Sequence, residues 1–326
     1  MRTFYNPEQA LELANLYAEL KQDDAFGEEA VGLYNNGRFE ELLAFFTSNS
    51  ELLLKLGDSE FEPVYNLLVA LAAQFPETIS TTVSSIIDPI VGDDQDRCSL
   101  KLKVLSNLYN YVQEPVEKFK IYTALVKVAS QHNEIAILNL KLDEVKKLVL
   151  EWGISQEETR DFYQLLSETQ DTTLSYHFLF ESLKLHEDAP ELATRGIKIA
   201  LSSPRIFQFE ELYNLPVVQA LAPSPLLDLL NIFLNKSLKE YSAFIKNHPQ
   251  LLKEHELNDQ ELLRKIRILT FASFATKNIS QVVTYQQITK VIDVQIDQVE
   301  FWIIDCIRAG LLEARIDQLN QSAHIK

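Results

Sequence analysis

Glycine is scarce in this sequence, with eight residues in a chain of 326. None of them forms a glycine-rich loop of the kind that holds the phosphates of a nucleotide. Low glycine content together with long runs of helical periodicity favours an all-α body. A nucleotide-binding site built on such a loop is therefore excluded.

Cysteine and long apolar runs are scarce too. Cys98 and Cys306 are too few for a disulfide framework, and Cys306 falls on an apolar helix face where a reduced thiol is expected. No apolar stretch approaches the ~20 residues of a membrane-spanning helix, and residues 1–7 lack the apolar core of a signal peptide. We therefore expect no membrane association and a reducing compartment, the cytosol or the nucleus.

The sequence also lacks the residue clusters that carry catalysis. His248 and His255 are close in the chain, but Pro249 separates them and no third ligand recurs at metal-site spacing. Ser106 and Ser167 have no histidine and acid partners that the sequence reveals. We predict no catalytic residue, no metal ligand, no cofactor site and no enzymatic activity.

Positive charge is in deficit, since 30 Lys and Arg face 47 Asp and Glu, for a net charge of −17. The deficit lies in residues 1–261, which carry −19, whereas residues 262–326 carry +2. So acidic a body either repels the phosphate backbone of nucleic acid or is a solvated surface with no specific partner. The sequence leaves both interpretations open.

Helical periodicity is abundant. Asn6 and Pro7 suit the start of a first helix, and Asn35-Asn36-Gly37 marks a tight turn between two short helical runs. Apolar residues recurring three and four apart predict further helices over 28–34, 64–75, 77–87, 97–110, 119–130, 142–152, 157–169, 173–185, 191–201, 226–234 and 238–246. This pattern predicts a solenoid-like body over residues 1–261.

Two stretches interrupt that body. The acidic residues 91–96 are the best candidate for a minor domain boundary. The stretch 202–225 holds four prolines, but it also contains Phe207 and Phe209. We therefore expect it to be a packed irregular segment and not a free linker.

Residues 262–326 form a separate module. A helical run over 262–271 precedes a β-branched and aromatic segment at 282–285. Helices are then predicted over 286–291 and, more strongly, over 297–309.

The end of this module changes period. Asp297 with Glu300 has the form of a capping box, and Gly310 suits the stop of the helix. After Gly310, apolar and polar residues alternate, with Leu312, Ala314 and Ile316 on the apolar side. A turn then leads to a short strand at 323–325. The order helix, strand, helix, helix, strand, strand is that of a winged helix. The predicted fold class is all-α, with a helical-repeat body and a C-terminal winged helix that contains a small antiparallel sheet.

Helix 297–309 has two apolar sides. The side expected to face the core carries Val299, Trp302, Ile303, Cys306 and Ile307. Phe301 and Ile304 fall on the opposite side, beside Arg308. Either the helical body or a partner must cover these two large apolar groups.

Winged helices often bind DNA, but the charge of this one argues against it. Helix 297–309 has a net charge of −2, so its insertion into a groove would add repulsion without releasing counterions. Arg264, Lys265 and Arg267 form a basic cluster on the leading helix. That cluster leaves RNA contact open beside the alternative of ion pairs with the acidic body.

The C-terminal residues resemble a PCI domain, the module shared by the proteasome lid, the COP9 signalosome and translation initiation factor 3. The resemblance rests on Thr284-Tyr285, Ile288, Asp297, Val299-Glu300, Ile303-Ile304-Asp305, Ile307-Arg308, Gly310-Leu311, Ala314 and Ile316-Asp317-Gln318. Upstream, the segments that resemble the m-subunit family of translation initiation factor 3 are Ser99-Leu100, Leu105–Tyr109, Leu125–Ala129 and Leu142–Val145 with Trp152. The resemblance runs from about residue 97 to 318, and it implies a further helical segment after the last strand.

This resemblance implies a function. The expected protein is a non-catalytic, cytoplasmic scaffold subunit of translation initiation factor 3, which joins other PCI and MPN subunits and meets the small ribosomal subunit indirectly. A PCI scaffold subunit of the COP9 signalosome or proteasome lid is the first alternative, and a nucleic-acid-binding winged helix is the second. Residues expected at the partner interface are Phe301, Ile304, Arg308, Leu312, Ala314, Ile316 and Gln318.

Overall fold

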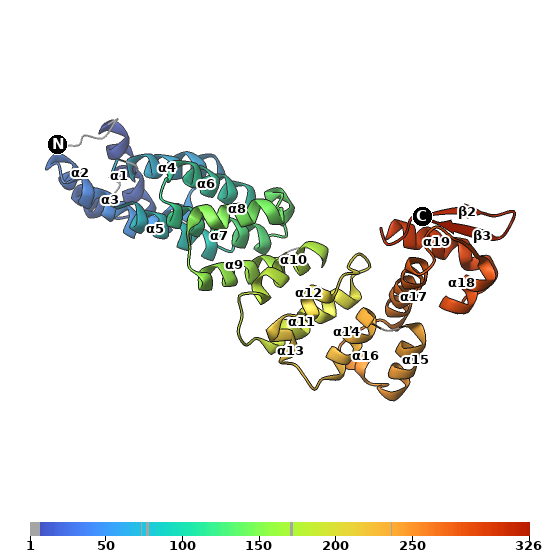
Figure 1. Cartoon of the computed structure of the whole chain (residues 1–326). Coiled ribbons are helices and arrows are strands. Elements are labelled where there is room, and N and C mark those ends of the chain that lie inside the picture. The colour runs from blue at the N-terminus through green and yellow to red at the C-terminus, as the bar shows by residue number, and fades with distance from the viewer. Residues whose placement is uncertain (1–6, 73, 76–77, 170–171, 236) are drawn as a thin grey trace. The chain divides into compact units, whose positions relative to one another are not determined.

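The computed structural model describes residues 7–326 except 73, 76, 77, 170, 171 and 236. Among these residues the chain is mainly helical, with one small sheet near the C-terminus (Figure 1). It divides into two compact units, residues 1–162 and 163–326. The expected all-α fold with a C-terminal winged helix is confirmed.

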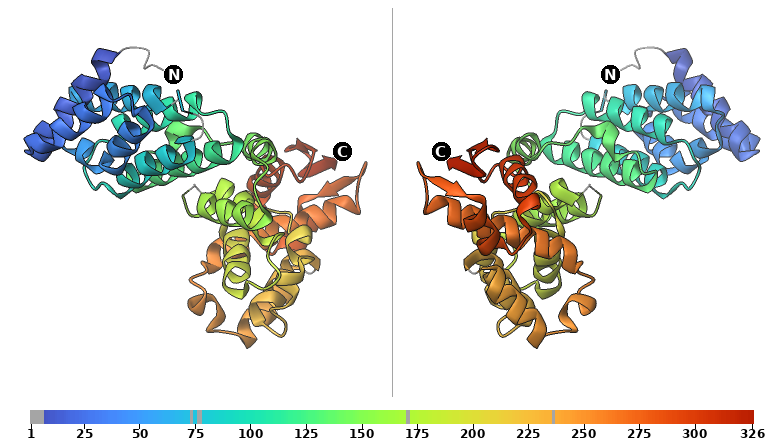
Figure 2. Two further views of the ribbon diagram at one scale, coloured as in Figure 1. Left: turned by 90° about the vertical axis from the view of Figure 1, so that its left-hand side faces the viewer. Right: turned by 90° about the vertical axis from the view of Figure 1, so that its right-hand side faces the viewer.

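The first unit is a stack of helices. Its elements are α1 (Pro7–Lys21), α2 (Asp24–Asn35), α3 (Phe39–Ser48), η1 (Ser50–Lys55), α4 (Asp58–Ala72), α5 (Ile79–Gly92), α6 (Cys98–Tyr111), α7 (Pro115–Gln131), η3 (Ile135–Leu138) and α8 (Leu142–Trp152). Helix α9 (Gln156–Thr169) runs across the division between the units. Both views of Figure 2 show the helices of residues 7–162 lying side by side. The expected N-cap at Asn6 lies outside the described residues.

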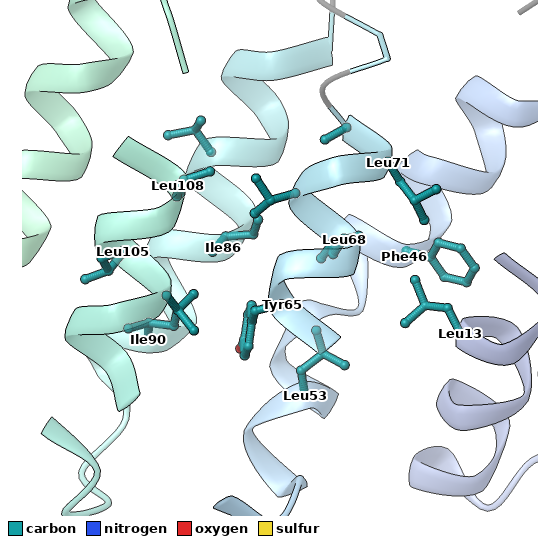
Figure 3. Packing of buried hydrophobic residues seen from close by; sticks show 14 of the residues in the cluster. Leu13, Phe46, Leu53, Tyr65, Leu68, Leu71, Ile86, Ile90, Leu105 and Leu108 are labelled. Atoms are coloured by element: carbon teal, nitrogen blue, oxygen red, sulfur yellow. The ribbon is translucent and has the colours of Figure 1, made fainter. Parts of the chain in front are cut away.

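One continuous core runs through this stack. Figure 3 shows its side chains converging from successive helices, among them Leu13, Phe46, Leu53, Tyr65, Leu68, Leu71, Ile86, Ile90, Leu105 and Leu108. The core explains why two prolines lie inside helices. Pro63 and Pro89 fall within α4 and α5, whereas the predicted helices 64–75 and 77–87 stop short of them. Burial of apolar residues on both sides of each proline offsets the missing backbone hydrogen bond.

The acidic stretch 91–96 is tied into the same unit. Lys101 is fully buried, and its Nζ donates to the carbonyl oxygens of Asp93 (2.5 Å) and Gln95 (3.0 Å). Its Nζ also lies 3.1 Å from Oδ2 of Asp93. This buried cation fixes the connection between α5 and α6.

The second unit begins with helices and ends with the winged helix. Its helical part consists of α10 (Thr172–Leu183), α11 (Pro190–Ser202), α12 (Glu210–Tyr213), α13 (Pro216–Gln219), α14 (Pro225–Asn235), α15 (Leu238–Asn247) and α16 (Leu251–Glu254). The stretch 202–225 is packed, as expected, because the two short helices α12 and α13 lie in it and Phe209 is buried.

The winged helix follows the predicted order. Its elements are α17 (Asp259–Thr276), β1 (Val282–Thr284), α18 (Tyr285–Ile292), η4 (Ile296–Gln298), α19 (Val299–Arg308), β2 (Ala314–Asp317) and β3 (Ser322–Ile325). The sheet is antiparallel with β3 in the middle, in the order β1-β3-β2. A division of the chain at 261/262 remains a prediction, because both sides of it belong to the second compact unit.

The starts of two helices differ from the expectation. Asp297 is not an N-cap, since it lies in η4 and α19 begins at Val299. The capping box is instead at α18, where Thr284 and Gln287 bond each other's backbone N–H groups. Glu300 is used elsewhere, because its carboxylate accepts hydrogen bonds from Tyr285 (3.1 Å) and Gln318 (3.3 Å).

Helix α17 joins two cores. Its N-terminal half contributes Leu262 and Ile266 to the core of the preceding helices. Its C-terminal half contributes Ile268 and Phe271 to the core of the winged helix. The winged helix is therefore joined to residues 163–258 by a continuous helix whose two halves are each packed.

Candidate protein-interaction surface

Helix α19 is held in the module by one apolar face. Val299, Trp302, Ile303 and Cys306 are buried on that face, as predicted. Ile307 was expected there as well, but this expectation is wrong, because its side chain is 37% exposed. The helix ends at Arg308, and the chain turns at Gly310 (φ +72°) to bring Leu312 into the core.

The opposite face of α19 is apolar and open to solvent. Phe301 is 56% exposed and Ile304 is 41% exposed, and Ile307 continues the row three residues further on. Spacing of three residues places these side chains on neighbouring turns of one helix face. We name Phe301, Ile304 and Ile307 the α19 stripe; the exposed Arg308 lies at its C-terminal end.

The outer edge of the sheet beside β2 is the second open feature. Lys326 N–H donates to the carbonyl of Glu313 (2.9 Å), so in this register Arg315 and Asp317 also form the hydrogen-bonded pairs with β3. The backbone N–H and C=O groups of Ala314 and Ile316 therefore point away from β3. We name this row of backbone groups the β2 edge.

The other two strands of the sheet have fewer backbone groups available to an added strand. β3 is the central strand, so both of its edges are already paired with β1 and β2. β1 is an outer strand, but its Thr284 N–H already donates to Oε1 of Gln287 (2.9 Å). The β2 edge is therefore the side of the sheet better suited to an added strand.

The predicted interface residues separate into three groups. Phe301, Ile304 and Arg308 lie together on the exposed face of α19. Ala314 and Ile316 turn partly buried side chains toward the winged-helix core, so only their backbone is offered at the edge. The remaining two differ from each other, since Leu312 is buried whereas Gln318 is exposed and donates to Glu300 at the surface.

The three basic residues of the cluster on α17 each contact other elements of the second unit. Arg264 pairs with Asp305 on α19, Lys265 is buried against backbone carbonyls, and Arg267 donates to the carbonyls of Ile292 and Asp293. These contacts correct the expectation of ion pairs with the acidic body. All three cations thus have partners within the second unit, and the Arg264 side chain is still 48% exposed.

Lys265 supplies a pH-dependent prediction. Three carbonyl oxygens match the three N–H donors of its ammonium, while burial lowers the pKa of Lys265 to about 7. The unfolded chain, with a lysine pKa of about 10.4, then binds one more proton than the folded chain between about pH 7 and 10.

The free energy of unfolding of the wild type, relative to Lys265→Met, should therefore rise with pH across that window, by up to about 1.4 kcal/mol per pH unit. Below pH 7 both states carry the proton, so the difference should be flat. Urea unfolding of both proteins from pH 6 to 10 measures it. A difference that stays constant to pH 10 would mean that the carbonyl oxygens keep the ammonium charged throughout.

Nothing in the described part of the chain points to catalysis. Residues 7–326, apart from the few that are not described, contain no group of three His, Cys, Asp or Glu placed to hold a metal ion. Burial raises the pKa of the Cys306 thiol to about 12, so it is protonated and unreactive at neutral pH. Within the same residues, every helix is too short or too polar to cross a lipid bilayer.

Comparison with known proteins shows what this chain is similar to. A PCI domain matches residues 239–326, which include α17, α19 and the sheet. Subunit M of eukaryotic translation initiation factor 3 from Chaetomium globosum is 28% identical over 93% of this chain and 76% of its own length.

Other organisms contain similar proteins. The subunit of the same name from Homo sapiens is 27% identical over 94% of the chain and 83% of its own length. The one from Dictyostelium discoideum is 27% identical over 90% of the chain and 78% of its own length. The similarity therefore begins upstream of residue 97, earlier than the sequence resemblance indicated. The chain is a PCI-domain protein that resembles subunit M of eukaryotic translation initiation factor 3 along most of its length.

Proposed function

We propose that this protein is a non-catalytic scaffold subunit of a translation initiation factor 3 complex. In this role it binds other PCI and MPN subunits in the cytoplasm and supports initiation on the small ribosomal subunit without contacting RNA itself. The observation that carries the proposal is the apolar stripe on α19, in the PCI domain of a chain similar to subunit M.

The α19 stripe is suited to a protein partner. Its three apolar side chains are presented on the face that a DNA-binding winged helix would turn to a groove. Complete burial of the Phe301 and Ile304 side chains on assembly would contribute roughly 2–4 kcal/mol. In a groove the same side chains would replace the cations that phosphates require.

The β2 edge supports the same proposal through a different interaction. The backbone groups of Ala314 and Ile316 can pair with an outer strand of a neighbouring sheet. Strand addition supplies directional hydrogen bonds, whereas the α19 stripe supplies apolar area. We propose that other PCI subunits dock on these two features together, with Arg308 at the rim of the contact.

Affinity purification tests the proposed function. A tagged full-length chain expressed in its native cell should recover several PCI and MPN subunits of initiation factor 3 in comparable amounts, as identified by mass spectrometry. Recovery of COP9 signalosome or proteasome lid subunits instead would support the alternative scaffold. Recovery of RNA that survives moderate salt, with no subunits, would support a nucleic-acid-binding winged helix.

Zinc content tests the non-catalytic part of the proposal. The purified full-length chain should retain much less than one equivalent of zinc after dialysis against a weak chelator, because the sequence offers no compact set of ligands. Elemental analysis by mass spectrometry measures this, with a known zinc protein dialysed in parallel. Stoichiometric retention would contradict the prediction and require a metal site.

A further inference from the structure

Three cations within one turn of α17 contact three different helices. Arg264, Lys265 and Arg267 lie at about 0°, 100° and 300° around the helix axis, so their side chains leave α17 in different directions. α17 is also the helix whose two halves are packed in different cores. The cations therefore lie where the helical part of residues 163–258 meets the winged helix.

Lys265 binds the end of α11. Its Nζ donates to the carbonyls of Ala200 (2.5 Å), Leu201 (3.2 Å) and Ser203 (2.6 Å). These acceptors lie in and just beyond the last turn of α11, where the helix dipole favours a positive charge. The faces of the Phe207 and Phe209 rings lie 5.6 and 5.0 Å from the same nitrogen. Lys265 therefore caps one helix from the side chain of another.

Arg267 binds the end of α18 in a similar way. Its guanidinium donates to the carbonyls of Ile292 (3.1 Å) and Asp293 (3.2 Å), at the C-terminus of that helix. The guanidinium also lies 5.5 Å from the centre of the Trp302 ring on α19, within the range of a cation–π contact. One side chain thus holds both short helices of the winged helix against α17.

Arg264 completes the set with a bidentate ion pair to α19. Its Nε and Nη2 donate to the two carboxylate oxygens of Asp305 at 2.8 and 2.6 Å. The Asp305 side chain is only 10% exposed, although its position four residues after Phe301 places it beside the α19 stripe. Two parallel bonds fix the direction as well as the distance between the partners.

We propose that Arg264, Lys265 and Arg267 are positioning residues, which set the orientation of the α19 stripe and the β2 edge relative to residues 163–258. Lys265 fixes α17 on the helical part, while Arg264 and Arg267 fix α18 and α19 on α17. This proposal rests on the proposed docking function, because the orientation matters for a scaffold whose neighbours approach at a set angle. In this proposal the three cations have a structural role, so the basic cluster in the sequence marks the junction between the helical part and the winged helix and not a nucleic-acid site.

Distances between spin labels in the full-length chain test the joint without a partner. Labels at Glu191→Cys on α11 and Gln286→Cys on α18, both exposed positions, are introduced in a Cys98→Ser background. We expect one narrow distance distribution for the parent and broad distributions for Lys265→Met and for Asp305→Asn. The matched control Lys277→Met removes an exposed cation after the same helix, and it should leave the distribution narrow.

The variants are informative even if one of them folds poorly. Asp305→Asn keeps the size of the side chain and one acceptor, so it serves where Lys265→Met fails to fold. Narrow, unchanged distributions in the folded variants would overturn the proposal, even if their melting temperatures fell, because lost stability alone is a packing effect.

Binding to a PCI subunit recovered by the purification separates this proposal from the proposed function. If the docking orientation falls to about a fifth of the population, the apparent Kd should rise about fivefold. Broad distributions with an unchanged Kd would overturn the positioning role. A parent chain that binds no PCI subunit would overturn the proposed function, while the label distances would still decide whether the cations hold the joint.

Discussion

Phe301→Asp is expected to abolish most of the binding to partner subunits while the isolated chain melts within a few degrees of the wild type. The aromatic ring is more than half exposed in the free protein, so the substitution removes little internal packing. In the complex it would remove apolar contact area and place a charge in an apolar interface, which costs about 2 kcal/mol or more and weakens binding by roughly thirtyfold or more.

Two measurements test the Phe301→Asp variant, and each includes a matched control. Thermal unfolding of the isolated chain and co-purification with PCI subunits should be compared with Leu150→Asp, which charges another exposed apolar residue on α8. That control should bind normally. A Phe301→Asp protein that melts early and still assembles would mean that the stripe packs within the chain and that the partner does not use it.

Ile316→Pro is expected to prevent assembly through the β2 edge. Proline removes the Ile316 N–H, which points away from β3 and would donate to an added strand. The hydrogen bonds to β3 are made by Arg315 and Asp317, so those ladder positions keep their N–H donors. Loss of the edge donor, together with the restricted φ angle of proline, should reduce recovery of PCI partners to background.

The control for this prediction is Ile316→Ala. It also loses the partly buried side chain but keeps the N–H, so it should assemble at a moderately reduced level. Pull-down of partner subunits from lysates with each variant measures the difference, and circular dichroism confirms that both are folded. Equal assembly of the proline and alanine variants would show that strand pairing at this edge is not the joint.

Much of the fold could be predicted because it depends on local pattern. The helix over 142–152 has the predicted bounds, since its apolar residues and the following Gly153 mark both its face and its end. Gly310 ends α19 for the same reason. The errors at Pro63, Pro89 and Asp297 came from local signals that packing overrides. The capping box at Thr284 had a readable sequence signal, threonine followed three residues later by glutamine.

The candidate site was only partly predictable. Phe301 and Ile304 could be assigned to one side of a helix from their spacing, but the exposure of Ile307 could not. Helical spacing groups side chains around an axis, whereas the width of the covered sector depends on which neighbours pack there. In this chain the turn after Arg308 brings Leu312 into the core, and Ile307 remains in solvent.

By itself the sequence determined the helical body, the winged-helix order at its end and the apolar side of α19. These follow from periodicity and composition, which act over neighbouring residues. Only the tertiary structure decided that β3 is the central strand, that the β2 edge is open and that Arg264, Lys265 and Arg267 contact α19, α11 and α18. In the sequence alone, three cations in one helical turn indicate a solvated surface. Folding places the ends of α11 and α18 and the carboxylate of Asp305 beside them. Those partners lie between 25 and 65 residues away in the chain, so their contacts depend on the completed fold.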